Sequence, residues 1–162
     1  MRKRKNLRLI FIIGSFIMAA SVTASDHPYP KFADDPAIEE FIYLINGKRQ
    51  RMGCVELKWD ERLAAVARNH SRDMARRNFF SHTNLDGDNP FDRLRDSHIS
   101  YSLAGENIAS GVRSGQAVYE LWLNSPDHAE NMLDCRFTHQ GVGRSGKRWT
   151  QVLLRPPKNQ HH

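Results

Sequence analysis

The stretch LAGENIASG, Leu103–Gly111, places one carboxylate, that of Glu106, among small and apolar residues with a glycine on each side. The run YSLAGENIA, from Tyr101 to Ala109, predicts an extended segment. The flanking glycines allow another part of the backbone to approach closely. Glu106 is therefore the first candidate functional residue, and the rest of the sequence supplies the groups that could act with it.

Two helices are predicted before this stretch, because apolar residues recur there at helical spacing. Asp35 and Pro36 give the first helix its N-cap and first turn, and Asp60 caps the second helix, which covers 61–78. His70 lies on the apolar side of the second helix. We interpret it as a core histidine that is hydrogen-bonded to a neighbour, with a ligand as the alternative.

A loop and a short third helix are predicted between the second helix and the opening stretch. The sequence FFSHTNLDGDNPFDRLRD, residues 79–96, contains His82 in the loop, and Asn89 and Pro90 begin the helix. His82 thus lies near an element boundary rather than on the face of a helix.

Another helix, SGQAVYELWLN (114–124), is predicted to follow, with Leu121 among its inward residues. In the next segment, NSPDHAENML, Ser125 is an N-cap candidate and His128 lies in the first turn, where the helix dipole disfavours a positive charge. A neutral imidazole binds metal or accepts a proton. The alternative is that His128 is only a polar residue of a first turn.

The runs FTHQGVGRSG and RWTQVLLR predict a hairpin around Gly146.

The composition suits one soluble globular domain preceded by an export signal. The chain has 162 residues, 40% hydrophobic and 26% charged, which favours a single core. Residues 1–24 combine a basic start, an apolar run and a small-residue site, so a signal peptide cleaved after Ala24 is predicted. An uncleaved anchor is the alternative, although the apolar run is shorter than the ~20 residues that span a bilayer. We expect a secreted protein, periplasmic or extracellular, without a transmembrane segment after cleavage.

Removal of this segment changes the charge of the protein. The segment carries five of the 24 Lys and Arg residues and none of the 18 acidic residues, so 19 basic and 18 acidic residues remain, a net charge of +1. No basic stripe with interleaved aromatic residues remains. Nucleic-acid binding is therefore not an expected function.

The two cysteines, Cys54 and Cys135, are expected to form one disulfide, because an exported chain enters a compartment where such a pair oxidises and stays oxidised. The alternative is a cysteine nucleophile, since Cys135 lies near His139 and a thiolate needs a histidine base. Two cysteines in an exported chain are more simply paired, so we favour the disulfide.

The segments FFSHTNLDGDNPFDRL, AGENIASG, WLNSPDHAENML, FTHQGVG and WTQ together resemble the bacterial branch of the CAP superfamily. This superfamily comprises cysteine-rich secretory proteins, antigen five and pathogenesis-related proteins, and the resemblance covers about residues 37–155. We divide the chain into a signal peptide (1–24), a polar, Pro-rich segment (25–36), a CAP domain (37–157) and a polar tail (158–162). The resemblance implies an α+β fold: an α–β–α sandwich with a small central antiparallel sheet between helical layers.

The resemblance also implies an open cleft that holds two histidines and one or two acidic residues. The matching positions are His82 of the SHT motif, Glu106 of the GEN motif, and His128 after the tryptophan-bearing helix. Eukaryotic members carry a second glutamate three residues after the tryptophan, and this chain has Ser125 there. Ser125 is expected to serve as a helix cap instead, which puts in doubt any mechanism that needs two carboxylates.

Three functions remain open for this cleft. Two imidazoles and a carboxylate with a fourth position open are the ligand set of an accessible zinc site, although a hydrogen-bonded His–Glu–His cluster also exists without metal. We prefer a secreted binding module that engages an envelope component, a lipid or other hydrophobic small molecule, or a protein partner. The alternative is a zinc-dependent hydrolase, in which zinc activates water and Glu106 ligates the metal or acts as base. A purely structural role of the cluster is the third.

Overall fold

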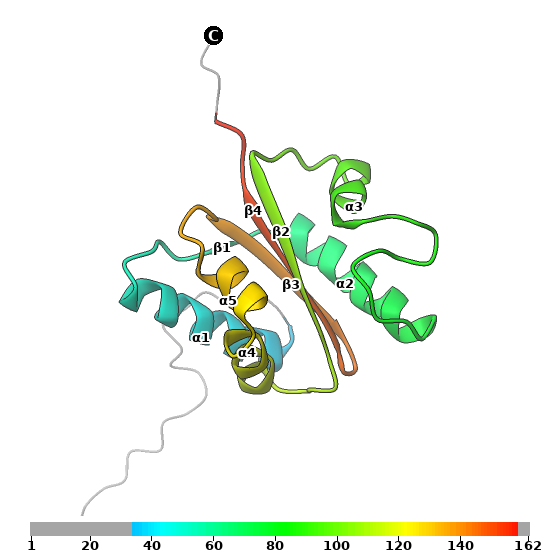
Figure 1. Cartoon of the computed structure of the whole chain (residues 1–162), viewed down its shortest axis with the longest axis horizontal. Coiled ribbons are helices and arrows are strands. Elements are labelled where there is room, and N and C mark those ends of the chain that lie inside the picture. The colour runs from blue at the N-terminus through cyan, green and yellow to red at the C-terminus, as the bar shows by residue number, and fades with distance from the viewer. Residues whose placement is uncertain (1–33, 159–162) are drawn as a thin grey trace, which may run out of the picture. The chain divides into compact units, whose positions relative to one another are not determined.

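The computed structural model describes residues 34–158. The predicted signal peptide and most of both the Pro-rich segment and the polar tail lie outside these residues. Among the described residues no helix is both long and apolar enough to cross a membrane. The elements follow in the order α1 (Pro36–Arg51), β1 (Lys58–Trp59), α2 (Glu61–Arg76), α3 (Pro90–Asp96), β2 (Leu103–Ser110), α4 (Gly115–Leu123), α5 (Pro126–Leu133), β3 (His139–Ser145) and β4 (Arg148–Arg155) (Figure 1).

The four strands form one sheet in the order β1-β3-β4-β2. The predicted hairpin is confirmed: β3 and β4 pair antiparallel around Gly146, whose φ of +60° is the left-handed conformation that glycine adopts easily. The opening stretch is β2, which pairs antiparallel with β4 from Leu103 opposite Arg155 to Ser110 opposite Arg148. The predicted small antiparallel sheet is confirmed for β2, β3 and β4, and the two-residue strand β1 adds a parallel pairing with β3 at its edge.

Helices cover both faces of this sheet, which confirms the α+β fold and the predicted sandwich (Figure 1). On one face α1, α4 and α5 pack over the strands, and on the other face α2 does. Strand β4 contributes to both layers in alternation. Trp149 and Leu153 belong to the core under α1, while Val152 and Leu154 belong to the core under α2.

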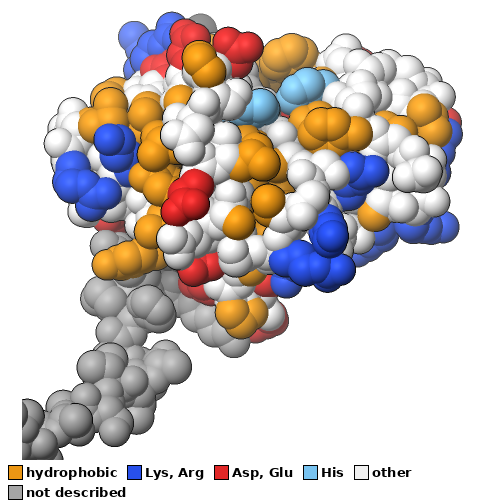
Figure 2. All heavy atoms as spheres, turned by 60° about the horizontal axis from the view of Figure 1, so that its bottom comes forward, with side chains coloured by type: hydrophobic (Ala, Val, Ile, Leu, Met, Phe, Trp, Pro, Cys, Tyr) orange, Lys and Arg blue, Asp and Glu red, His pale blue; other side chains and the backbone are white. Residues whose placement is uncertain are grey.

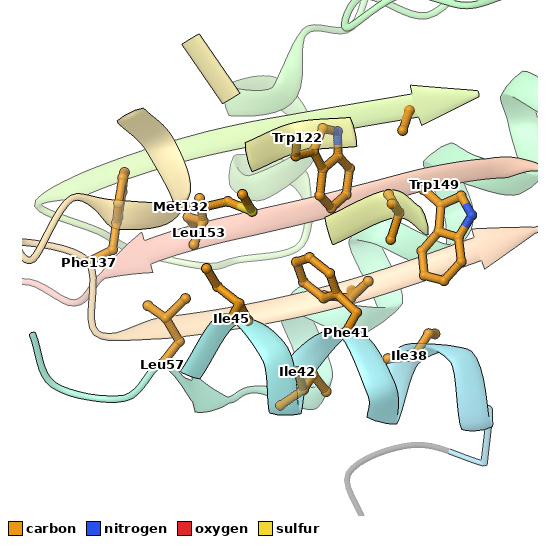
Figure 3. Packing of buried hydrophobic residues seen from close by; sticks show 13 residues of the cluster. Ile38, Phe41, Ile42, Ile45, Leu57, Trp122, Met132, Phe137, Trp149 and Leu153 are labelled. Carbon is orange, nitrogen blue, oxygen red and sulfur yellow. The ribbon is translucent and has the colours of Figure 1, made fainter. Parts of the chain in front are cut away.

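The larger core lies under α1 and is built around aromatic side chains. Phe41 points from α1 toward the strands and meets Trp122 of α4 edge to face, with ring centroids 5.3 Å apart (Figure 3). The indole N–H of Trp122 donates to the carbonyl of Ile108 at 3.0 Å, so this buried polar group is satisfied. The contact ties α4 to β2, the strand that carries Glu106.

The α2 layer lies unusually close to the sheet because β3 presents two glycines to it. A Cβ added at Gly141 would come within 2.0 Å of the backbone nitrogen of Ala64, and one at Gly143 within 2.2 Å of that of Arg68. Ser71 of α2 donates a hydrogen bond to the carbonyl of Gly143 at 2.9 Å. The close approach fixes the position of α2 and of the loop that follows it.

A polar cluster and a disulfide close the end of the domain where α1 stops. Cys54 and Cys135 form a disulfide across 81 residues, as predicted. Beside it, the fully buried guanidinium of Arg49 donates hydrogen bonds of 2.8–3.1 Å to four backbone carbonyls. These carbonyls belong to Val55, Met132, Asp134 and Phe137, and we call Arg49 with them the Arg49 knot.

Candidate functional site

Two of the three predicted site residues are in direct contact. Glu106 lies in the middle of β2 with only 2% of its side chain exposed, and His82 lies in the loop between α2 and α3 with 50% exposed. The Nδ1 atom of His82 is 2.8 Å from Oε1 of Glu106. Since a carboxylate oxygen only accepts hydrogen bonds, Nδ1 carries the proton in this contact, and Nε2 is the ring nitrogen left for another partner.

Arg93 of α3 completes this contact and was not predicted from the sequence. Its Nη2 donates to Oε2 of Glu106 at 2.7 Å, and its Nη1 donates to the carbonyls of His82 and Asp88 at 2.9 and 3.0 Å. Glu106 therefore lies between a guanidinium and an imidazole, and Arg93 also holds the His82 loop in place. The cap at Asn89 places Arg93 on a helix, but only the tertiary contact between α3 and β2 gives it this partner.

His128, the third predicted residue, lies in the first turn of α5 and has a different partner. Its Nδ1 is 2.7 Å from Oγ of Ser125, and its ring stacks on Trp122 with centroids 6.4 Å apart. Burial and then the neighbouring His82 lower the pKa of His128, with Asp127 acting in the opposite direction. A lowered pKa agrees with the neutral imidazole predicted for His128. The largest cause of the lowering is burial, and not the helix dipole expected from the sequence.

Ser125 stands at the predicted N-cap position of α5, but its hydroxyl makes no capping hydrogen bond to the helix backbone. The predicted side-chain cap is therefore wrong. The physical reason is a competing partner: the hydroxyl of Ser125 hydrogen-bonds with Nδ1 of His128, three residues later in the chain, instead of with the helix backbone. Ser125 orients His128 in the way that Glu106 orients His82, so both histidines have Nδ1 engaged.

His70 is a core residue that contacts the loop carrying His82. It is buried in α2, and its Nε2 is 3.0 Å from the carbonyl of Ser81, the residue next to His82. Burial is the main reason that the pKa of His70 is lowered. The interpretation of His70 as a hydrogen-bonded core histidine is confirmed.

Both site histidines line one open pocket with a volume of about 540 Å³. The other lining residues are mostly apolar or small: Phe80, Ser81, Ile108, Ala109, Ser110 and Leu121. Leu121 was predicted to point inward, and instead 39% of it is exposed at this pocket, because Val118 and Trp122 form the buried side of α4. On this face, histidine side chains lie close together and are bordered by hydrophobic side chains (Figure 2).

The groups around the pocket do not fit the three-ligand zinc centre that the sequence suggested. Both oxygens of Glu106 are engaged, one by His82 and one by Arg93, whose positive charge opposes a cation at this carboxylate. Within residues 34–158, no three or more His, Cys, Asp or Glu side chains are grouped so that they could hold a metal ion. The nitrogen atoms left for a ligand are Nε2 of His82 and Nε2 of His128.

A family model described as CAP, the cysteine-rich secretory protein family, matches residues 42–153. The chain therefore belongs to the CAP family. It is 42% identical over 118 residues to the uncharacterized protein YkwD of Bacillus subtilis (strain 168), a match that covers 72% of this chain and 46% of that protein. The chain thus spans about half the length of this curated relative.

Solved structures agree with this assignment. An extracellular protein containing an SCP domain from Bacillus anthracis (strain Ames) superposes with a TM-score of 0.70 at 39% identity, covering 72% of this chain and 39% of that one. An outer surface protein of Borrelia burgdorferi has the same TM-score at 23% identity, covering 75% of this chain and 93% of that one. The second similarity supports the fold alone.

Proposed function

We propose that this CAP domain is a binding module for small amphipathic molecules, whose apolar chain occupies the pocket beside His82 and His128. The observation that carries the proposal is the composition of the pocket wall. Phe80, Ile108 and Leu121 supply apolar surface, and the two histidines supply polar atoms at the same opening. A few convergent polar groups in an otherwise apolar concavity are typical of small-molecule sites.

The size of the pocket suits an alkyl chain of moderate length. Its volume of about 540 Å³ lies within the range of roughly 300–1,000 Å³ that small-molecule sites span. Each buried methylene contributes about 0.8 kcal/mol of transfer free energy, so a chain of about ten carbons gives measurable affinity even when only part of it is covered. Phe80 and Leu121 are also partly exposed, which keeps apolar surface at the opening.

The description of a relative as extracellular supports this proposal. The Bacillus anthracis protein, 39% identical to this chain, is described as an extracellular protein. Together with the predicted signal peptide, this relative favours a secreted protein that meets lipids and other envelope components. The ligand then comes from the envelope or from the medium.

Zinc-dependent hydrolysis at the same pocket is the alternative, and the geometry favours it less. It needs Glu106 as a metal ligand or as a base, and this carboxylate is held by Arg93 and His82. What favours some chemistry at the pocket is the orientation of His82, because an imidazole held at Nδ1 by a carboxylate presents Nε2 as a proton acceptor. Zinc titration of the parent, His82→Ala and His128→Ala would reveal a metal centre as one site that is lost in both variants.

The binding proposal is tested by calorimetric titration of the mature protein, from Ser25 onward, with decanoate below its micellar concentration. We expect one site, and we expect Leu121→Asn to weaken it by about tenfold because apolar wall is lost. Leu85→Asn is the matched control, since Leu85 is an exposed leucine that does not line the pocket. The absence of binding, or equal effects of the two substitutions, would show that the pocket is not the site.

A further inference from the structure

We propose that Arg148 recognises the head group of the pocket ligand and makes the pocket selective for amphiphiles with an acidic head, a carboxylate or a phosphate monoester. This inference rests on the proposed function and adds the chemical class of the ligand. Arg148 is not itself a lining residue, but both of its side-chain contacts are with residues that line the pocket.

These contacts place the guanidinium at the edge of the pocket. Arg148 is the first residue of β4 and pairs with Ser110 of β2 across the sheet. Its Nη1 donates a hydrogen bond to Oγ of Ser110, and its guanidinium carbon lies 5.6 Å from the centroid of the Phe80 ring. A guanidinium stacked on a ring and fixed by a hydroxyl is held in one orientation, which lowers the entropy lost when it binds a ligand.

Arg148 also differs from the other partly buried arginines in the described region, because it has no carboxylate partner there. Arg68 pairs with Glu61 at 2.8 Å, Arg93 with Glu106 at 2.7 Å, and Arg144 with Asp35 at 2.6 Å. Arg148 is partly buried, and its described contacts are a hydroxyl and an aromatic ring. Most of its five N–H donors are therefore available to a ligand.

The pocket offers this cation no competing negative charge. None of the eight lining residues is acidic. The carboxylate of Glu106, which contacts the lining residue His82, is itself paired with Arg93. An anion at the edge of the pocket thus meets Arg148 without repulsion from the wall. Carboxylates and phosphates match the planar guanidinium in a bidentate manner, and such charge-assisted bonds are about twice as strong as neutral ones.

The experiment compares four ligands by calorimetry on the same mature protein: decyl phosphate, decanoate, 1-decanol and inorganic phosphate. We expect both anionic amphiphiles to bind at least about tenfold more tightly than 1-decanol, and inorganic phosphate to give no measurable binding. Arg148→Gln should remove the preference for the acidic head while leaving the affinity for 1-decanol unchanged. Arg148→Lys should retain part of the preference, since it keeps the charge and loses the fork.

Arg155→Gln is the matched control, because Arg155 is an exposed arginine at the opposite end of β4. It should not alter any of the four affinities, and circular dichroism establishes that each variant is folded. Equal affinity of the parent for decyl phosphate and 1-decanol, or an unchanged preference in Arg148→Gln, would overturn the role of Arg148 while leaving an amphiphile site. Inorganic phosphate that binds as tightly as decyl phosphate would overturn the amphiphile class. If no amphiphile binds at all, the proposed function itself fails.

Discussion

Arg49 and Arg93 are both largely removed from solvent, with 0% of Arg49 and 12% of the Arg93 side chain exposed, and their hydrogen bonds go to different groups. In the Arg49 knot the side chain is fully buried, and four backbone carbonyls at 2.8–3.1 Å take its hydrogen bonds. Arg93 meets two carbonyls and the carboxylate of Glu106, while its buried Nε has no partner among the described residues. Through Glu106 it also leads to His82, which is half-exposed at the pocket. In the Arg49 knot every guanidinium nitrogen has a partner, so this cluster serves to hold the fold together. The cluster of Arg93, Glu106 and His82 leaves one nitrogen of Arg93 unpartnered among the described residues and reaches the open pocket, which suits it to bind a ligand.

The largest effect that this comparison predicts is that of Arg49→Met. The substitution keeps much of the apolar volume but leaves four carbonyls without their donors at a buried site, so we expect a loss of more than about 4 kcal/mol in the free energy of unfolding. Urea denaturation measures it. Arg51→Met, on the exposed side of the same helix turn, is the control and should change stability by less than about 0.5 kcal/mol. Similar values for the two variants would mean that the Arg49 knot does not stabilise the fold.

The disulfide beside the knot should have the next largest effect. Cys54→Ser with Cys135→Ser opens a loop whose ends are 81 residues apart, and the chain-entropy account gives a loss of about 4 kcal/mol. The unfolding midpoint of the double variant, compared with that of the oxidised parent, measures the loss. The non-reduced parent should also weigh two protons less than the reduced protein. Free thiols in the parent after oxidising purification would contradict the pairing.

The parts of the fold that could be predicted from the sequence are those set by local chemistry. Asp35, Asp60 and Asn89 cap helices where they were expected, because a cap side chain and the apolar spacing after it lie within one or two turns of sequence. The parallel pairing of β1 could not be predicted. Two residues, Lys58 and Trp59, carry no periodicity, and their pairing depends on where β3 lies after the chain has folded.

The candidate site was predictable in its members but not in its connections. The resemblance to the CAP family pointed to His82, Glu106 and His128, and the structure brings the first two into contact. The partner of Arg93 and the position of the Ser125 hydroxyl could not be derived. In both cases several acceptors or donors compete for one side chain, and only the tertiary arrangement decides which one is within reach.

Substitution of Glu106 measures how much its carboxylate contributes to the stability of the site and to the orientation of His82. Glu106→Gln leaves Arg93 without a buried negative partner, and we expect a loss of about 3 kcal/mol in the free energy of unfolding. The pair of Glu61 and Arg68, whose side chains are 64% and 41% exposed, is the control, and Glu61→Gln should cost less than about 1 kcal/mol. Nitrogen-15 chemical shifts of His82 report its tautomer. A spectrum unchanged by Glu106→Gln would contradict the orienting role of the carboxylate.

Acidification should destabilise the protein by a smaller amount. Burial is the largest cause of a lowered pKa at His70, His128 and His139, whose ordinary value is 6.5. The unfolded chain therefore binds more protons than the native one below pH 6.5, and stability falls as the pH drops through this range. Asp60, whose pKa is lowered mainly by its hydrogen bond with Arg62, affects stability only nearer its ordinary value of 3.8.

Urea midpoints at pH 7.5 and 5.5 measure this effect, for which we expect a loss of about 1 kcal/mol at the lower pH. His70→Gln should reduce the pH dependence because it removes the most buried of the three imidazoles. His98→Gln, which changes an exposed histidine, is the control. Stability that rises between pH 7.5 and 5.5 would show that other groups outweigh these histidines.

The smallest expected loss of stability is that of Ser125→Ala. A serine that caps a helix and a serine that bonds a histidine predict different losses. A capping serine contributes about 1 kcal/mol, but this hydroxyl bonds Nδ1 of His128 and not the helix backbone, so Ser125→Ala should cost less than about 0.5 kcal/mol. Ser114→Ala is the matched control, because the hydroxyl of Ser114 does accept a hydrogen bond from the backbone N–H of Ala117 at the start of α4. That variant should show the full loss of a cap.

Nuclear magnetic resonance titration should show a changed pKa at His128 in Ser125→Ala alone, since only there does the imidazole lose a partner. Equal losses of stability in the two variants, with an unaltered titration of His128, would return Ser125 to the role of a helix cap and leave His128 without a residue that orients it toward the pocket.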